Sequence, residues 1–228
     1  MKKVKYNFKI ANEIKLIIII SMIFLLIINY FNLDFYFANL IYQPTNSWFY
    51  QEHWITNTLI HQFGKDTLIL LYLFLLFQFY FRDKSKEDTF DRYGKIVLLS
   101  SILIGTLMVS ILKNSLSVDC PWDLIQFGGD KPYFSLLNYN PSYLPSSHCF
   151  PSGHASTAFT WISLYFYASI YHTTKRLKIL GLILLIGFGF GLSQQFRGAH
   201  FISHDLWSLL VCIFINIIIY SIAFRNIK

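Results

Sequence analysis

The stretch CFPSGHAS, residues 149–156, lies where a polar segment gives way to a long apolar one. Ser152 and Gly153 are common at helix starts, so the stretch predicts a helix that begins there. The apolar run that follows is long enough to cross a membrane. His154 therefore stands at the mouth of a membrane-length segment, where a titratable side chain calls for an explanation.

The composition of the whole chain is typical of a membrane protein. Of its 228 residues, 54% are hydrophobic and only 14% are charged, which lies outside the usual range of soluble domains. The length suits a single domain, 1–228, and no internal repeat divides it. The net charge of +7 could suggest nucleic acid, but the basic residues lie in short clusters between apolar runs. Nucleic acid is therefore not expected as a partner.

Six segments are apolar and long enough to cross a bilayer, since a spanning helix needs about 20 mostly apolar residues. The sequence thus predicts an all-α integral membrane protein, a bundle of six transmembrane helices. A signal peptide is the alternative for the first segment, but no small-x-small cleavage pattern follows it, so we expect it to be retained. The predicted spans lie near 14–33, 66–82, 95–113, 154–172, 179–196 and 204–224.

Lys and Arg are distributed unevenly between the two predicted faces. With both termini on one side, 15 of the 19 basic residues fall on that side. Because basic loops tend to stay in the cytoplasm, we expect cytoplasmic termini and an outer active-site loop, 113–154. The four basic residues on the outer face are Lys65, Lys113, Lys131 and Arg197.

The segment 44–65 mixes large apolar residues with polar ones. The pattern indicates a helix that lies in the outer interface. An aromatic belt is the simpler interpretation, and we favour it slightly over contact with a substrate. The large apolar residues are Trp48, Trp54, Ile55, Leu59 and Phe63.

Ionisable residues gather at three predicted span ends on the outer face. A single one is readily explained as a capping or snorkelling side chain, but three clusters at one depth indicate a functional site. With the Ser-Gly helix start they would form a cradle for an anion, and phosphate fits it best. They are Lys113 at the third span, His154 at the fourth, and Arg197, His200, His204 and Asp205 between the fifth and sixth.

We expect neither a metal ion nor a cofactor in this cradle. A metal site would need clustered carboxylates or a set of Cys and His at ligand spacing, whereas the Asp residues of this face are scattered. His200 and His204, four residues apart, could in principle hold a metal ion, and this stays an alternative.

These clusters resemble the type 2 phosphatidic acid phosphatase (PAP2) superfamily, in its bacterial membrane lipid phosphatase branch. The family pattern has three parts, K-x6-R-P, P-S-G-H and S-R-x5-H-x3-D. Their order, their spacing and the six spans all agree, so the resemblance covers nearly the whole chain. In this sequence the parts read KNSLSVDCP (113–121), PSGH (151–154) and SQQFRGAHFISHD (193–205).

The resemblance implies a six-helix PAP2 bundle and metal-independent phosphoryl transfer through a phosphohistidine. It makes His200 the nucleophile and His154 the acid that protonates the leaving oxygen. Lys113, Ser152 and the Gly153 amide would hold the phosphoryl oxygens. Imidazole suits both roles, because one histidine must be neutral to attack and the other protonated to donate.

The sequence departs from the family pattern at both arginines, which are replaced by Cys120 and Gln194. Arg197 lies three residues after Gln194, so the two share a face if the fifth helix continues that far. We therefore expect Arg197 to bind phosphate. Lys131 could supply the charge lost at Cys120, although a solvated loop lysine is the simpler interpretation.

The family's final aspartate, four residues after His200, is His204 in this chain. Asp205 lies one position further on. Either Asp205 reaches back to His200, or His204 orients the nucleophile in its place. The sequence leaves both alternatives open.

Cys120 and Cys149 both fall in the predicted outer loop, in an oxidising compartment, while Cys212 lies alone in the sixth span. A bridge between the first two would tie the first motif to the second. It would close a loop of about 30 residues and stabilise it by roughly 3–4 kcal/mol on the chain-entropy model. Two free thiols are the alternative.

Together these patterns predict an enzyme that removes phosphate from a bilayer lipid at the periplasmic face of a bacterial inner membrane. Lipid A phosphate is the first choice of substrate, because the outer leaflet of that membrane presents it. Undecaprenyl diphosphate and phosphatidylglycerophosphate follow. A lipid phosphotransferase would use the same residues. A non-catalytic lipid-phosphate binder or transporter is the rival from another class, although it has no evident need for two histidines.

Overall fold

In the computed structural model, residues 9–81, 88–134, 147–171 and 174–225 are described, and they confirm the expected all-helical class. These residues form no extended strand, and a single isolated bridge joins Leu124 to Lys131. A π-helix, η1 (Ile55–Gly64), runs directly into α3, and two 3-10 turns, η3 (Pro121–Asp123) and η4 (Ile125–Phe127), follow α4. The α-helices are α1 (Asn12–Tyr30), α2 (Leu33–Tyr42), α3 (Lys65–Phe81), α4 (Thr89–Ser115), α5 (Gly153–Phe159), α6 (Ile162–Tyr171), α7 (Arg176–Phe196) and α8 (Ile202–Ala223).

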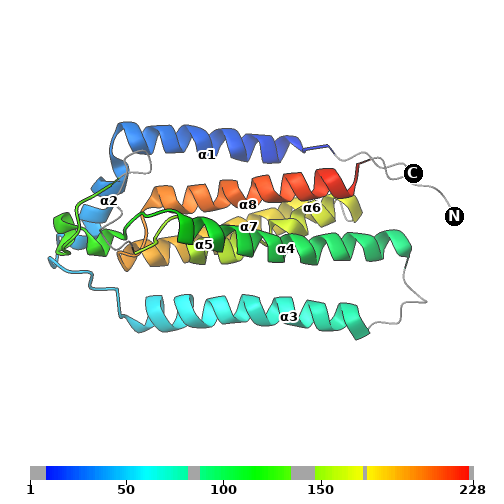
Figure 1. Cartoon of the computed structure of the whole chain (residues 1–228), viewed down its shortest axis with the longest axis horizontal. Helices are drawn as coiled ribbons and strands as arrows, with labels where there is room; N and C mark the ends of the chain where they lie inside the picture. Colours follow the sequence, from blue (N-terminus) through cyan, green and yellow to red (C-terminus); the bar gives the residue numbers. More distant parts are fainter. Residues whose placement is uncertain (1–8, 82–87, 135–146, 172–173, 226–228) are drawn as a thin grey trace.

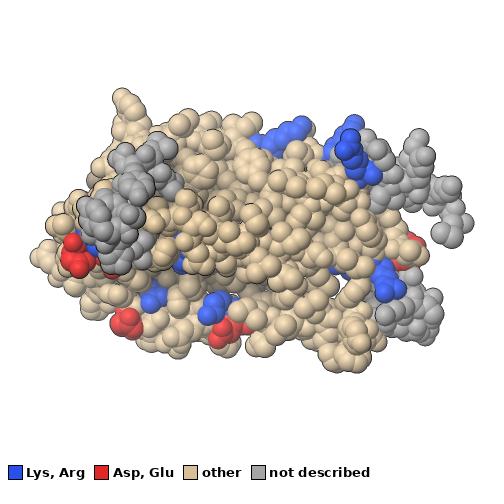
Figure 2. Space-filling model, in the orientation of Figure 1, with Lys and Arg blue, Asp and Glu red and all other residues tan. Residues whose placement is uncertain are grey.

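Five helices of the described residues are long and apolar enough to cross a membrane. They are α1, the continuous η1 and α3, α4, α7 and α8. Few charged side chains are visible on the face drawn in Figure 2, and most of that surface is neither acidic nor basic. The chain thus has the helices of a membrane protein.

The fourth predicted span consists of two shorter helices, α5 and α6, so in the described residues five of the six predicted spans correspond to single membrane-length helices. The chain breaks at Thr160 and Trp161, between α5 and α6. The N–H of Trp161 donates to the carbonyl of Ala158 at 3.0 Å, a three-residue step that tightens the helix. Thr160 also lies against Gly105 of α4, where an added Cβ would come within 3.1 Å of its methyl group.

The second predicted span begins earlier than the sequence indicates. The interfacial helix expected in 44–65 is wrong for its second half, because η1 continues α3 and forms with it one helix, Ile55–Phe81. Thr56 is buried, whereas Leu59 and Phe63 are exposed. The apolar residues of η1 thus face outward from the bundle while a polar edge faces inward.

The first span ends earlier than predicted. Helix α1 stops at Tyr30, and Asn32 adopts a left-handed backbone, φ 53°. The chain then turns into α2, which the sequence did not indicate. The predictions for the lysines before residue 9, for 82–87, for the part 135–146 of the active-site loop, for residue 172 and for 226–228 fall outside the described residues.

The core of the bundle lies among α4, α5, α6, α7 and α8, with α1 and α3 on opposite outer sides in Figure 1. Helix α5 packs closely on α7 because Gly187 lacks a side chain, and a Cβ there would come within 2.1 Å of the Phe159 ring. Some polar groups in the core are paired, as where the Tyr220 hydroxyl donates to the Ser163 carbonyl at 2.9 Å. Helices α4, α5, α7 and α8 bring their loops to the end of the bundle opposite the last turn of α8 (Figure 1).

A carboxylate of α2 holds the first turn of α8 at this end. Oδ1 of Asp34 accepts the backbone N–H of Ser203 at 3.0 Å, and Oδ2 accepts its hydroxyl at 2.5 Å. Burial raises the pKa of Asp34, and the hydrogen bonds from Ser203 act in the opposite direction. Because the first N–H groups of a helix lack partners within it, Asp34 caps α8 from outside.

We expect Asp34→Ala to lower the thermal unfolding midpoint in detergent, because the loss of a helix cap costs about 1 kcal/mol. Asp66→Ala is the matched control, since the side chain of Asp66 is 61% exposed. Equal midpoints for the two variants would contradict a capping role for Asp34.

Candidate active site

The structure brings the first motif part against the second. Lys113 lies in the last turn of α4, and Gly153 begins α5. A Cβ on Gly153 would lie 3.5 Å from the Lys113 Nζ, so the ammonium group sits directly beside the glycine. Glycine leaves this approach open.

Ser152 joins the second motif part to the third. It is fully buried, and its backbone N–H donates to the carbonyl of His204 at 3.4 Å. The hydroxyl of Ser208 donates to the carbonyl of Ser152 at 2.9 Å. The start of α5 is thereby fixed to the first turns of α8.

His200 and His204 lie next to each other near this joint between α5 and α8. Both are buried, and their ring centroids are 5.8 Å apart. Each imidazole hydrogen-bonds to the backbone of Cys149. Burial, and secondarily the nearby His204 and Lys113, lower the pKa of His200 well below its ordinary value. His200 is therefore neutral near neutral pH, as a nucleophilic nitrogen must be.

Asp205 is held against α7. Its Oδ2 accepts a hydrogen bond from Nε2 of Gln195 at 2.7 Å. The carboxylate also packs on α7, where a Cβ on Gly191 would come within 2.3 Å of the same oxygen. Asp205 therefore joins α8 to α7, while His204 lies beside His200.

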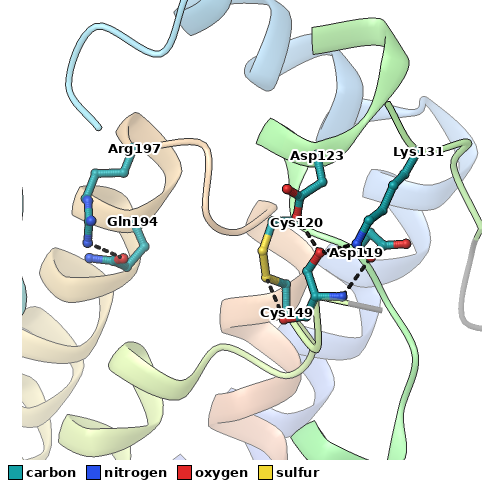
Figure 3. Close-up of a disulfide and its surroundings, with 8 residues drawn as sticks. Asp119, Cys120, Asp123, Lys131, Cys149, Gln194 and Arg197 are labelled. Atoms are coloured by element: carbon teal, nitrogen blue, oxygen red, sulfur yellow. Dashed lines mark hydrogen bonds and ion pairs between the residues drawn. A yellow bond between two sulfur atoms is a disulfide. The ribbon is translucent and has the colours of Figure 1, made fainter. Parts of the chain in front are cut away.

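Arg197 lies at the end of α7, next to Gln194. Helix α7 continues to Phe196, and Arg197 follows it in helical geometry. The Arg197 NH1 donates to Oε1 of Gln194 at 3.2 Å, and Figure 3 shows the guanidinium pointing along α7 toward that amide. Its Nε donates to the carbonyl of Gln51 at 2.8 Å. The guanidinium is thus buried and anchored at both ends.

We expect Arg197→Ala to lower phosphate release from a lipid phosphate by about 10- to 100-fold, because a hydrogen bond to a charged group contributes about 1.5–3 kcal/mol. Arg197→Lys should recover part of this loss, since it keeps the charge and loses the planar fork. Arg225→Ala, exposed beyond α8, is the control. Unchanged release by Arg197→Ala would remove Arg197 from the site.

Cys120 and Cys149 form a disulfide in the structure, with their Cα atoms 5.1 Å apart (Figure 3). The N–H of Cys149 also donates to the carbonyl of Val118 at 2.7 Å. Because the backbone of Cys149 contacts both His200 and His204, the disulfide ties the end of the first motif to the two imidazoles.

Lys131 does not replace the arginine lost at Cys120. Its Nζ pairs with Oδ1 of Asp119 at 3.0 Å and donates to the hydroxyl of Ser147 at 2.8 Å. That hydroxyl also donates to Asp123. Lys131 is neither in the phosphate cradle nor a solvated loop lysine, because it closes a polar network beside the disulfide (Figure 3).

Reduction of the disulfide should lower the free energy of unfolding by about 3–4 kcal/mol, the value for a loop of this length. Alkylation of the denatured chain should label only Cys212 before reduction and all three cysteines after it. Mass spectrometry measures the number of labels. Three labels without reduction would contradict the disulfide.

The structure adds a histidine that sequence reasoning missed. His61, on η1, stacks on His154 with ring centroids 3.7 Å apart and an interplanar angle of 25°. The sequence did contain a sign of it, because an ionisable residue beside a membrane-length apolar run is unusual. Without the helical continuity of η1 and α3, however, nothing in the sequence joined His61 to the PSGH segment.

The fold and the site together define an all-helical protein with membrane-length helices and a cluster of Lys, Arg and His side chains suited to phosphate. The chain belongs to the PAP2 superfamily, whose sequence model matches residues 94–228, from within α4 to the C-terminus. This confirms the resemblance to the superfamily, and the matched region includes all three motif parts. Members of the superfamily are phosphatases, which suggests activity on lipid phosphates. The chain has no significant match among curated proteins or solved structures.

Proposed function

We propose that the protein is a metal-independent lipid phosphate phosphatase that works through a phosphohistidine. The observation that carries the proposal is the convergence of three chain segments, in which Lys113 lies beside Gly153 and the Ser152 backbone is bonded to that of His204. In this arrangement the cations face the same region as the histidines of both later motifs.

In the proposed reaction, a nitrogen of neutral His200 attacks phosphorus and the bond from phosphorus to the lipid oxygen breaks. His154 gives its proton to that leaving oxygen. Water then attacks the phosphohistidine, the N–P bond breaks, and phosphate is released. Lys113, Arg197, the Ser152 hydroxyl and the Gly153 amide stabilise the charge that develops on the phosphoryl oxygens.

His204 is the proposed orienting group for His200, since it lies 5.8 Å away by ring centroid while Asp205 is held by Gln195. Asp205 then acts through the packing of α8 on α7. No group of three or more His, Cys, Asp or Glu side chains in the described part of the chain is arranged to hold a metal ion. A chelator tests the metal-independent proposal directly.

The proposed setting is the inner membrane of a bacterium, with both termini cytoplasmic and the site at the periplasmic face. The uneven, 15-to-4 division of Lys and Arg between the two sides of the predicted spans supports this orientation. A lipid head group would then enter from the outer leaflet while its acyl chains stay in the bilayer. Lipid A phosphate is the preferred substrate, ahead of undecaprenyl diphosphate and phosphatidylglycerophosphate.

The test is phosphate release from these three lipids by purified protein in detergent with a chelator present. We expect the wild type to release phosphate and His200→Ala to lose at least about 100-fold, the usual contribution of a nucleophile or proton-transfer group. His53→Ala, a histidine outside the cradle, should match the wild type.

Three other outcomes would each redirect the proposal. Loss of activity with the chelator would mean that His200 and His204 hold a metal ion. Transfer of phosphate to a second lipid without free phosphate would identify a phosphotransferase. Binding of lipid phosphate without turnover would leave a non-catalytic binder.

A further inference from the structure

The segment that carries His61 is held firmly against α7. The hydroxyl of Ser193 donates to the carbonyl of Thr56 at 3.3 Å, near the start of η1. At the other end of η1, Gly64 meets the Phe190 ring, which a Cβ there would approach to 2.8 Å. His61 lies between these two contacts, so its place over the site is set by helix packing.

The His61 ring covers one face of the His154 ring. The two planes are 3.7 Å apart by centroid and 25° from parallel. Nδ1 of His61 and Nε2 of His154 are both buried and have no hydrogen-bond partner among the described residues. These two nitrogens are thus not engaged by another described group, and one face of the His154 ring is covered by His61.

The charges around this pair come from three other elements. Lys113 of α4, Lys65 at the start of α3 and Arg197 after α7 all act electrostatically on both rings. Two protonated imidazoles at this separation would repel each other as well as these cations. The pair therefore carries at most one proton.

We infer that His61 is a positioning residue for His154, the proton donor of the proposed phosphatase; the inference rests on that proposed function. An imidazole transfers a proton only when its nitrogen comes within about 2.6–3.2 Å of the leaving oxygen. A stacked ring restricts rotation of the His154 side chain and so holds its nitrogen toward the cradle.

His61 does not transfer a proton in the proposed reaction. His154 loses its proton to the leaving lipid oxygen and regains one from the water that attacks the phosphohistidine. His61 neither gains nor loses a proton in either step. Another flat ring should therefore replace it.

The experiment compares His61→Ala, His61→Phe and the control Gln62→Ala, an exposed neighbour on the same turn of η1. Their kcat and KM are measured on the best lipid phosphate and on p-nitrophenyl phosphate, whose leaving phenolate needs no proton. Thermal midpoints and size-exclusion profiles are recorded for each variant, and His200→Ala is included.

For the lipid phosphate, we expect His61→Ala to lower kcat at least about tenfold with KM changed less than about threefold, since general acid catalysis contributes about 10²–10⁴. His61→Phe should stay within about threefold of the wild type, and Gln62→Ala should equal it. With p-nitrophenyl phosphate, His61→Ala should keep a burst of one phenolate per chain followed by slow turnover, because only the second step then needs His154.

A His61→Ala variant as active as the wild type would overturn the inference and leave the proposed function intact. So would a His61→Phe variant as impaired as His61→Ala with a raised KM, since His61 would then bind the phosphate itself. Failure of the wild type to release phosphate from any lipid would overturn the proposed function and this inference with it.

Discussion

The active site depends on the backbone joint between the start of α5 and the first turns of α8. Ser152 donates to the carbonyl of His204 and accepts from the hydroxyl of Ser208, so the joint has bonds in both directions. Because these segments are about 50 residues apart in sequence, only tertiary packing holds His154 near His200. Asp34 supports the same joint from outside by capping α8.

The cations at this end of the bundle explain why the site is suited to an anion. Lys113 is partly buried and Arg197 is buried, both act electrostatically on His154, and repulsion between positive charges is stronger there than in solvent. A phosphate dianion would relieve that repulsion and accept their hydrogen bonds. Burial is the main reason that His200 stays neutral, and the nearby His204 and Lys113 add to it, so the surroundings that suit a phosphate also prepare its attacker.

The altered motif is accommodated by segments outside it. Arg197 stands one helical turn beyond the position of the lost arginine, and Gln194 accepts its hydrogen bond. The Gln51 carbonyl fixes its other side, and the loop containing Gln51 is held because Trp48 packs on Gly198. Gly198 has φ +77°, and a Cβ there would meet the indole ring at 2.3 Å. The first lost arginine has no such substitute, because Cys120 is bound to Cys149 and Lys131 pairs with Asp119.

The sequence by itself determined the helical class, most of the long apolar helices and the family, because hydrophobic run length and motif spacing are local properties. It also identified the partners Arg197 and Gln194, since three residues on a helix share a face. Only the tertiary structure decided the direction of Asp205, the continuation of η1 into α3 and the stacking of His61 on His154. These depend on how helices distant in sequence pack, on which glycines let them approach, and on where each buried polar group finds a partner.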